Sequence, residues 1–158
     1  MYKRLFKKIK NIKFFYFFIL FFLIIPNFVF AENYFLTLRN DKVNLRQGPS
    51  LDYPIKLQYK KKYLPVLVKD KSGNFRKIVD HQNNSGWIHI SQLSKKKAAI
   101  TTDDDLILFS SSTIYSNPIA ILKKGRLVRI NKCKNKWCKV YTGEFKGWLQ
   151  KKSLWGLL

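Results

Sequence analysis

GWIHISQL at residues 86–93 returns as GWLQKKSL at residues 147–154, with the same Gly-Trp start and the same closing Leu. Two shorter matches precede this pair in each half of the chain: Pro54-Ile55 with Pro118-Ile119, and Phe75–Ile78 with Trp137–Val140. The offsets run from 64 through 62 to 61 residues. Small loop deletions therefore separate two copies of one unit of about 60 residues.

Each copy contains short runs of alternating apolar and polar residues, separated by Gly, Pro, Asn, Asp and Ser. This pattern is typical of strands with one buried face, and helical periodicity is nearly absent. We expect strands at Tyr34–Leu38, Val43–Arg46, Lys56–Gln58, Leu64–Val68, Phe75–Val79 and Gly86–His89 in the first copy. In the second copy we expect them at Ala98–Thr101, Leu106–Phe109, Ala120–Leu122, Leu127–Ile130, Trp137–Tyr141 and Gly147–Gln150.

The sequence thus predicts an all-β protein with two small domains, residues 35–94 and 98–158, joined by the short linker Ser94–Lys97. A domain of about 60 residues buries only ~60% of the surface that its unfolded chain exposes. We therefore expect the two domains to pack against each other.

Residues 1–31 have the three-part organisation of a secretory signal peptide. Residues 1–13 carry six basic side chains and no acid, and an unbroken apolar run follows from Phe14 to Ile25. Val29-Phe30-Ala31 then places small or branched residues at the −3 and −1 positions of a cleavage site. We expect export, with cleavage after Ala31. The alternative is an uncleaved membrane anchor, although the apolar run is short of the roughly 20 residues that span a bilayer.

The net charge of +22 is smaller once the expected signal peptide is set aside. Six of the 31 Lys and Arg lie there, which leaves +16 on residues 32–158. This balance fits an acidic partner such as nucleic acid, anionic lipid or an anionic wall polymer. It fits the codon use of an AT-rich genome equally well, because Lys dominates over Arg. Export and the lack of any nucleic-acid-binding motif argue against nucleic acid.

The two cysteines, Cys133 and Cys138, stand in the segment NKCKNKWCKV. The flanking segments read as strands, and a turn at Lys134–Trp137 would place the cysteines opposite each other. Opposed Cα atoms in a hairpin lie ~4.5–5.5 Å apart, which is within reach of a disulfide. A metal site would need more ligands, and His81 and His89 lie far away in the sequence. We therefore expect a structural disulfide and no bound metal or cofactor.

One segment of the first copy, VNLRQGPS at residues 43–50, has a plain structural meaning. Val43 and Leu45 point to one face of a strand, and Asn44 and Arg46 point to the other. Gly48-Pro49 then turns the chain. Near the end of the copy, Gly86 lets the chain enter the last strands, and Trp87 is expected to fill a large share of a small core.

This set of motifs, with Tyr53-Pro54 between them, resembles a bacterial Src-homology-3-like (SH3-like) domain. The longer segments RKIVDHQNNSGWIHISQLS, KCKNKWCKV and GWLQKKSLWG resemble a family of exported double-domain proteins of Gram-negative bacteria. The resemblance implies two tandem small SH3-like β-barrels in the periplasm, or on an uncleaved inner-membrane anchor. It also makes Gly147 and Trp148 the counterparts of Gly86 and Trp87.

The second copy departs from this pattern. It has LILFSSST at residues 106–113 where the first copy has VNLRQGPS, so any ligand role of that motif would reside in the first copy alone. Phe75 stands where the family usually has Trp.

No catalytic pattern is present. The chain has two His and nine acids, without a Ser-His-Asp order or a phosphate-binding loop. Asp103–Asp105 fits a solvated turn better than a metal site, and His81 and His89 fit solvated positions. We therefore expect a protein that is not an enzyme.

The leading hypothesis is a cell-envelope module that binds peptidoglycan or an extended peptide in a shallow aromatic groove. The candidate groove residues are Arg46, Tyr53, Tyr59, Tyr63 and Trp87. Tyr53 and Trp87 fit core or turn packing as well, and Arg46 could pair with a nearby acid. A second hypothesis is a periplasmic interaction scaffold with an envelope protein as its partner. A third is binding to an anionic membrane surface through the clusters Lys60–Lys62, Lys95–Lys97 and Lys123-Lys124.

Overall fold

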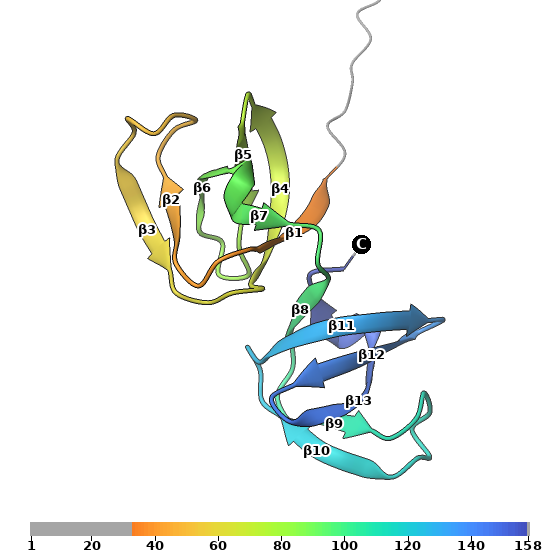
Figure 1. Cartoon of the computed structure of the whole chain (residues 1–158). Helices are drawn as coiled ribbons and strands as arrows, with labels where there is room; N and C mark the ends of the chain where they lie inside the picture. The colour runs from red at the N-terminus through yellow and green to blue at the C-terminus, as the bar shows by residue number, and fades with distance from the viewer. Residues whose placement is uncertain (1–32, 158) are drawn as a thin grey trace, which may run out of the picture. The chain divides into compact units, whose positions relative to one another are not determined.

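The computed structural model describes residues 33–157, so the expected signal peptide and its cleavage after Ala31 lie outside the described residues. Within that range the chain forms two seven-stranded antiparallel sheets, each built from one copy of the repeat (Figure 1). The expected all-β fold with two tandem units is confirmed. No helix in the described part of the chain is long and apolar enough to cross a membrane.

The first barrel has the strand order β3-β2-β6-β5-β4-β1-β7. Its strands are β1 (Tyr34–Leu38), β2 (Val43–Arg46), β3 (Ile55–Tyr59), β4 (Pro65–Ser72), β5 (Phe75–Val79), β6 (Ser85–His89) and β7 (Leu93–Ser94). A single 3₁₀ turn, η1 (Ile90–Gln92), links β6 to β7.

The second barrel repeats this order as β10-β9-β13-β12-β11-β8-β14. Its strands are β8 (Ala98–Thr101), β9 (Leu106–Phe109), β10 (Pro118–Leu122), β11 (Leu127–Lys134), β12 (Trp137–Thr142), β13 (Phe145–Gln150) and β14 (Leu154–Trp155). The 3₁₀ turn η2 (Lys151–Ser153) takes the place of η1.

The strands differ from the predicted ones mainly in length. β4 and β11 run on past Val68 and Ile130 as long arms that are exposed at their ends. These arms pair only within a hairpin, so their side chains lack the apolar alternation that marks a buried strand. The short closing strands β7 and β14 were not predicted, because two residues carry no periodicity.

Each barrel has its own core of alternate apolar residues, because every second side chain of a strand points inward. The first core includes Leu38, Leu45, Ile78 and Ile88, which are fully buried. The second includes Leu108, Val128, Val140 and Leu149, with the buried Cys138 beside them.

The expected disulfide closes the hairpin between β11 and β12. Cys133 and Cys138 are directly opposed and bonded, with their Cα atoms 4.0 Å apart. The turn between the strands is tight, because Asn135 adopts the left-handed conformation that asparagine tolerates (φ 52°). The prediction of a structural disulfide is confirmed.

The two barrels pack against each other. Ile100 of β8 belongs to the core cluster of the first barrel, and Leu127 of β11 packs against it. The ring of Trp155 meets Phe35 edge to face at 4.9 Å between centroids. Gly156 is required beside this contact, because a Cβ there would lie 2.9 Å from the Pro65 Cβ of the first barrel.

The linker is held by both barrels. The Thr37 hydroxyl of the first barrel donates a hydrogen bond of 2.9 Å to the Lys96 carbonyl. The Ile130 amide of the second barrel donates one of 2.9 Å to the carbonyl of the next residue, Lys97. Lys96 and Lys97 therefore have fixed backbone positions between the barrels.

The ladder also corrects the repeat alignment at one point. Gln47 and Pro54 share a backbone hydrogen bond in the first barrel, and Ser110 and Asn117 share the equivalent bond in the second. Pro54 is thus the counterpart of Asn117, one position away from the sequence match with Pro118. The two loops have the same length, so the Pro-Ile dipeptides match in sequence without occupying equivalent positions.

Candidate functional site

Arg46 and Trp87 form the centre of an outer surface on the first barrel. They are directly opposed on β2 and β6, and both side chains are half-buried on the face that points away from the core. Lys77 of β5 lies opposite Trp87 on its other side. The expectation that Trp87 fills the core is wrong, because the inward positions of β6 belong to Gly86 and Ile88.

Tyr53 joins this surface from the loop between β2 and β3. Its ring lies over Gly48, where a Cβ would approach a ring carbon to 2.5 Å, so only glycine fits below the ring. The Arg46 guanidinium donates a hydrogen bond of 2.7 Å to the Tyr53 carbonyl and so fixes the loop. Tyr53 remains 47% exposed, which leaves its ring available to a ligand.

Ile55 extends the same surface, because it is opposed to Arg46 on β3 and is 50% exposed. We call Arg46, Tyr53, Ile55 and Trp87 the outer patch. Sequence reasoning missed Ile55, because an isoleucine beside Pro54 is indistinguishable from a core residue before the bulge in the β2–β3 ladder is known.

Tyr59, expected in the groove, is instead a core residue. It is 7% exposed, and its hydroxyl donates a hydrogen bond of 2.9 Å to the Asp80 carboxylate. Burial and the neighbouring Asp80 charge raise the pKa of the Tyr59 hydroxyl far above its ordinary value. The sequence alone does not indicate that Tyr59 is buried, because the inward direction of the last residue of β3 is evident only in the structure.

Asp80 is the buried acceptor at the centre of that network, 2% exposed. One carboxylate oxygen accepts the backbone amides of Gln82 and Asn84 at 2.8 and 2.9 Å, and the other accepts the Asn84 side-chain amide and Tyr59. Burial alone would raise the pKa of Asp80, but these hydrogen bonds hold it below the ordinary value. We call this network the Asp80 knot.

The remaining motif residues are structural. Val43 and Leu45 are buried, Pro49 is half-buried in the loop, and Asn44 accepts a hydrogen bond of 3.0 Å from Gln58 on the outer face. Gly86 and Gly147 allow the closest strand approach in each barrel. A Cβ on either would lie 2.6 Å from a backbone oxygen of the neighbouring strand.

In the second barrel, Trp148 takes the place of Trp87. It is half-buried on the outer face and is opposed to Phe109, which stands where the first barrel has Arg46. Lys139 lies over the Trp148 ring at 5.8 Å, and Phe109 meets Trp137 edge to face. This barrel therefore keeps the tryptophan but has Phe109 in place of the arginine and Ser116 in place of Tyr53.

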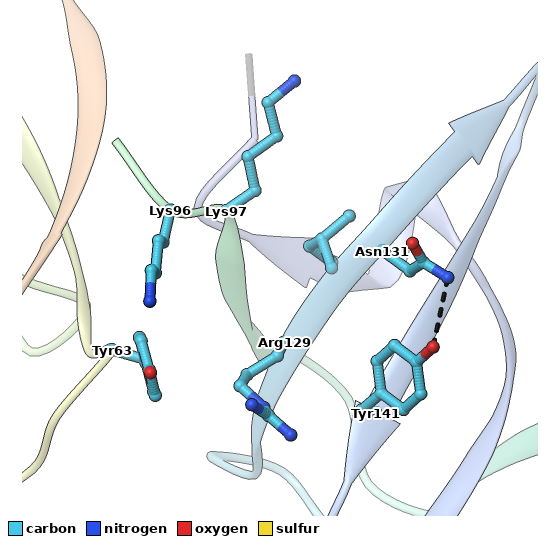
Figure 2. A pocket seen from close by; sticks show the side chains of 7 residues that line it. Tyr63, Lys96, Lys97, Arg129, Asn131 and Tyr141 are labelled. Atoms are coloured by element: carbon cyan, nitrogen blue, oxygen red, sulfur yellow. Dashed lines mark hydrogen bonds between the residues drawn. The ribbon is translucent and has the colours of Figure 1, made fainter. Parts of the chain in front are cut away.

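Tyr63 lies away from the outer patch, in a hollow of about 430 Å³ between the barrels (Figure 2). The hollow is lined by Tyr63, Lys96, Lys97, Arg129, Ile130, Asn131 and Tyr141. It contains three cationic side chains and no acid among its lining residues. Of the five candidate residues, Arg46, Tyr53 and Trp87 lie in the outer patch. Tyr59 lies in the core, and Tyr63 lines the separate hollow.

Arg129 and Tyr141 were not foreseen, because the hollow exists only once the barrels are docked. The two residues are directly opposed on β11 and β12. Arg129 lies over the Tyr63 ring at 5.8 Å and over the Tyr141 ring at 5.9 Å. The Lys96 ammonium also lies over the Tyr63 ring, 5.5 Å from its centroid.

Metal-binding side chains do not gather in the described residues. Among residues 33–157, no group of three His, Cys, Asp or Glu side chains could hold an ion. His89 accepts a backbone hydrogen bond from Ser91 and caps η1.

The fold and its two outer surfaces define a pair of SH3-like barrels. A family model described as Bacterial SH3 domain matches residues 39–95 and 109–156, more than half of the chain. The chain therefore belongs to the bacterial SH3 domain family and carries two copies of the domain in tandem. Bacterial SH3 domains are often cell-wall binding modules. The disulfide points to a compartment outside the cytoplasm.

Solved structures similar to this chain include two proteins of Trichomonas vaginalis, NlpC2 and NlpC1. NlpC2 is 11% identical, with a TM-score of 0.36 and coverage of 78% of this chain and 48% of that chain. NlpC1 is 11% identical, with a TM-score of 0.35 and coverage of 80% and 46%. The chain spans about half the length of both. A search of the curated proteins found no match.

Proposed function

We propose that this protein is a non-catalytic binding module of the cell envelope, exported to the periplasm by residues 1–31. Its first barrel binds peptidoglycan or an extended peptide at the outer patch. The observation that carries the proposal is the exposed Tyr53 ring, in a loop held by the guanidinium of Arg46, the strand partner of Trp87, in a domain of a family that often binds cell walls.

The chemistry of the outer patch supports this function. Two aromatic rings offer flat apolar faces to a sugar ring or to an extended peptide, and Arg46 adds donors for a carbonyl or carboxylate. Gly48 and the Arg46 hydrogen bond hold the Tyr53 loop in place, so little conformational entropy is lost on binding. Tyr53 and Ile55 are about half exposed, so the patch is accessible to a polymer.

Co-sedimentation with purified peptidoglycan sacculi tests the proposal. We expect the protein to pellet with sacculi at moderate salt, and we expect Tyr53→Ala to weaken binding about tenfold because an anchoring ring is lost. Tyr115→Ala is the matched control, because Tyr115 is a loop tyrosine of the second barrel with 90% exposure. Equal effects of the two substitutions, or no pelleting of the unmodified protein, would contradict the proposal.

A periplasmic scaffold is the second candidate function, and one surface of the second barrel favours it. Ile107 and Ile121 are opposed on β9 and β10 and are 42% and 65% exposed, at the edge of the sheet. An exposed apolar edge strand can pair with a strand of another protein. Capture of one envelope protein, lost in Ile121→Gln and unaffected by sacculi, would favour this function over wall binding.

A further inference from the structure

The hollow between the barrels has the donors of an anion-binding site. Each of the other arginines in the described residues, Arg39, Arg46, Arg76 and Arg126, donates a hydrogen bond to a protein oxygen. The Arg129 guanidinium makes no hydrogen bond or ion pair with any described residue and instead lies over two tyrosine rings. Its five N–H donors are therefore free for an external acceptor.

Tyr141 is oriented as a further donor. Its hydroxyl oxygen accepts a hydrogen bond of 3.2 Å from the Asn131 side-chain amide, so its own proton is free for a second acceptor (Figure 2). Asn131 reaches Tyr141 because the β11–β12 ladder shifts register between Ile130 and Lys132, and a bulge of this kind redirects a side chain. The Tyr141 hydroxyl thus adds a free donor to the lining of the hollow.

The positive charge of the hollow is uncompensated. Lys96, Lys97 and Arg129 line it without an acid, and Lys62 lies 5.6 Å from the Tyr63 ring. The single ion pair among the described residues, Lys123 with Asp105, involves none of them. Like charges gathered in a hollow repel each other, and a bound anion relieves that repulsion. The linker hydrogen bonds fix the backbone of both lysines between the barrels.

Tyr63 forms the wall of the hollow at a cost to its own backbone. It has φ 66°, a left-handed conformation that side chains other than Gly and Asn rarely adopt. At the equivalent turn of the second barrel stands Gly125, with φ 78° and the same type of amide hydrogen bond to the first strand of its barrel. A tyrosine at a position where the sister barrel has glycine is a local strain of the kind that accompanies binding sites.

We propose that this hollow binds a compact anionic group, a carboxylate or a phosphate, on a ligand that also presents a flat or apolar part. Arg129 and the Tyr141 hydroxyl hold the anionic oxygens, Lys96 and Lys97 add charge, and the Tyr63 ring covers the apolar part. The site goes beyond the proposed wall-binding function, because it shares no residue with the outer patch and is built from both barrels and the linker.

Titration of the purified protein with small probes, followed by calorimetry at low salt, tests this site. We expect benzoate and phenyl phosphate to bind saturably and benzamide, the neutral isostere of benzoate, to bind at least about tenfold more weakly. Arg129→Gln should weaken benzoate binding about tenfold, and Tyr141→Phe should weaken it several-fold. Lys132→Gln is the control, because it removes one charge from the same strand outside the lining.

Equal affinity for benzoate and benzamide, or equal effects of Arg129→Gln and Lys132→Gln, would overturn the proposal. Tyr63→Gly gives a second readout that folding cannot confound, because the sister barrel has glycine at this turn. Tyr63→Gly should weaken the binding of phenyl phosphate more than that of inorganic phosphate, since only phenyl phosphate has a ring to contact Tyr63. An equal loss for both probes would remove Tyr63 from the site.

Two sources of the anionic group can be separated. Vesicles of phosphatidylcholine with and without phosphatidylglycerol present the group as a lipid headgroup, whereas phenyl phosphate and benzoate present it in solution. Binding that depends on Arg129 in either format supports the site and identifies the source, and binding in neither format that depends on Arg129 overturns it. Tyr53→Ala should leave benzoate binding unchanged, so failure of the wall-binding proposal and failure of this one are distinguishable.

Discussion

In the first barrel a buried carboxylate, Asp80, accepts four hydrogen bonds after the end of β5, whereas the equivalent position of the second barrel holds Thr142. Thr142 is also buried, but it is neutral and accepts one hydrogen bond of 2.9 Å from Arg126. The partner of Asp80, Tyr59, is replaced by the apolar Leu122. The second barrel has the disulfide in the hairpin where the first has none.

Two copies of one strand order are thus stabilised by different chemistry. The Asp80 knot depends on the ionisation of a carboxyl group, and the hairpin disulfide depends on the redox state. The fold of the repeat therefore does not prescribe which interactions stabilise it. The two barrels should respond separately to acid and to reductant.

The largest effect is expected from Asp80→Ala. This substitution leaves the Tyr59 hydroxyl, two backbone amides and the Asn84 amide without their acceptor, and it should cost the first barrel about 3 kcal/mol of unfolding free energy. Amide hydrogen exchange, read for each barrel separately, measures the loss. Asp103→Ala, which removes an exposed acid, is the control. An equal loss of protection in both barrels would contradict the comparison.

Removal of the disulfide should have the next largest effect. The loop between Cys133 and Cys138 is short, so its closure contributes about 2 kcal/mol, and this contribution belongs to the second barrel. A double substitution of both cysteines to Ser should reduce hydrogen-exchange protection in β11 and β12 and leave β4 and β5 unchanged. Reductant should reproduce the result in the unmodified protein. Loss of protection in the first barrel would refute the assignment.

Acid should destabilise the first barrel selectively. Because the pKa of Asp80 is lower in the folded state, the unfolded chain takes up a proton first, at about pH 3.9. The stabilisation by the Asp80 knot is therefore fully present above that pH and is lost as the pH falls towards the folded-state pKa. Denaturant unfolding at a series of pH values measures this loss. The loss should be absent in Asp80→Ala, and a persisting one would assign it to another group.

The smallest effect is expected on the outer face of the edge hairpins. Asn44 and Gln58 of the first barrel are joined by a hydrogen bond, whereas their counterparts Ile107 and Ile121 are exposed and apolar. The double substitution Ile107→Asn and Ile121→Gln should change the unfolding free energy by less than about 0.5 kcal/mol, because surface exchanges rarely matter more. Thermal unfolding measures this. A large loss would show that the isoleucines contribute to the fold instead of to an interaction surface.

The repeat and the inner faces of its strands could be predicted from the sequence because alternation and turn residues are local signals. The disulfide followed from the spacing of Cys133 and Cys138 in a hairpin. The exposure of each tyrosine could not be predicted, since Tyr53, Tyr59 and Tyr63 look alike in the sequence. A bulge, the end of a strand and a left-handed turn decide whether each is exposed, buried or on an interface.

The hollow between the barrels could not be predicted from the sequence, for a different reason. Arg129 and Tyr141 come together by hairpin register, which is local, but Tyr63 and Lys96 reach them only through the docking of two barrels. One signal was present in the repeat alignment. Tyr63 aligns with Gly125, and a tyrosine opposite a glycine at a turn indicates a residue kept for its side chain.

The linker has a mechanical consequence. The carbonyls of Lys96 and Lys97 are adjacent in the chain, yet one is bonded to the first barrel and the other to the second. The two carbonyls belong to consecutive peptide units that meet at the Lys97 Cα, so a twist of one barrel against the other must rotate the φ and ψ of this one residue or break one of the two hydrogen bonds. A rotation of one barrel is therefore transmitted directly to the other.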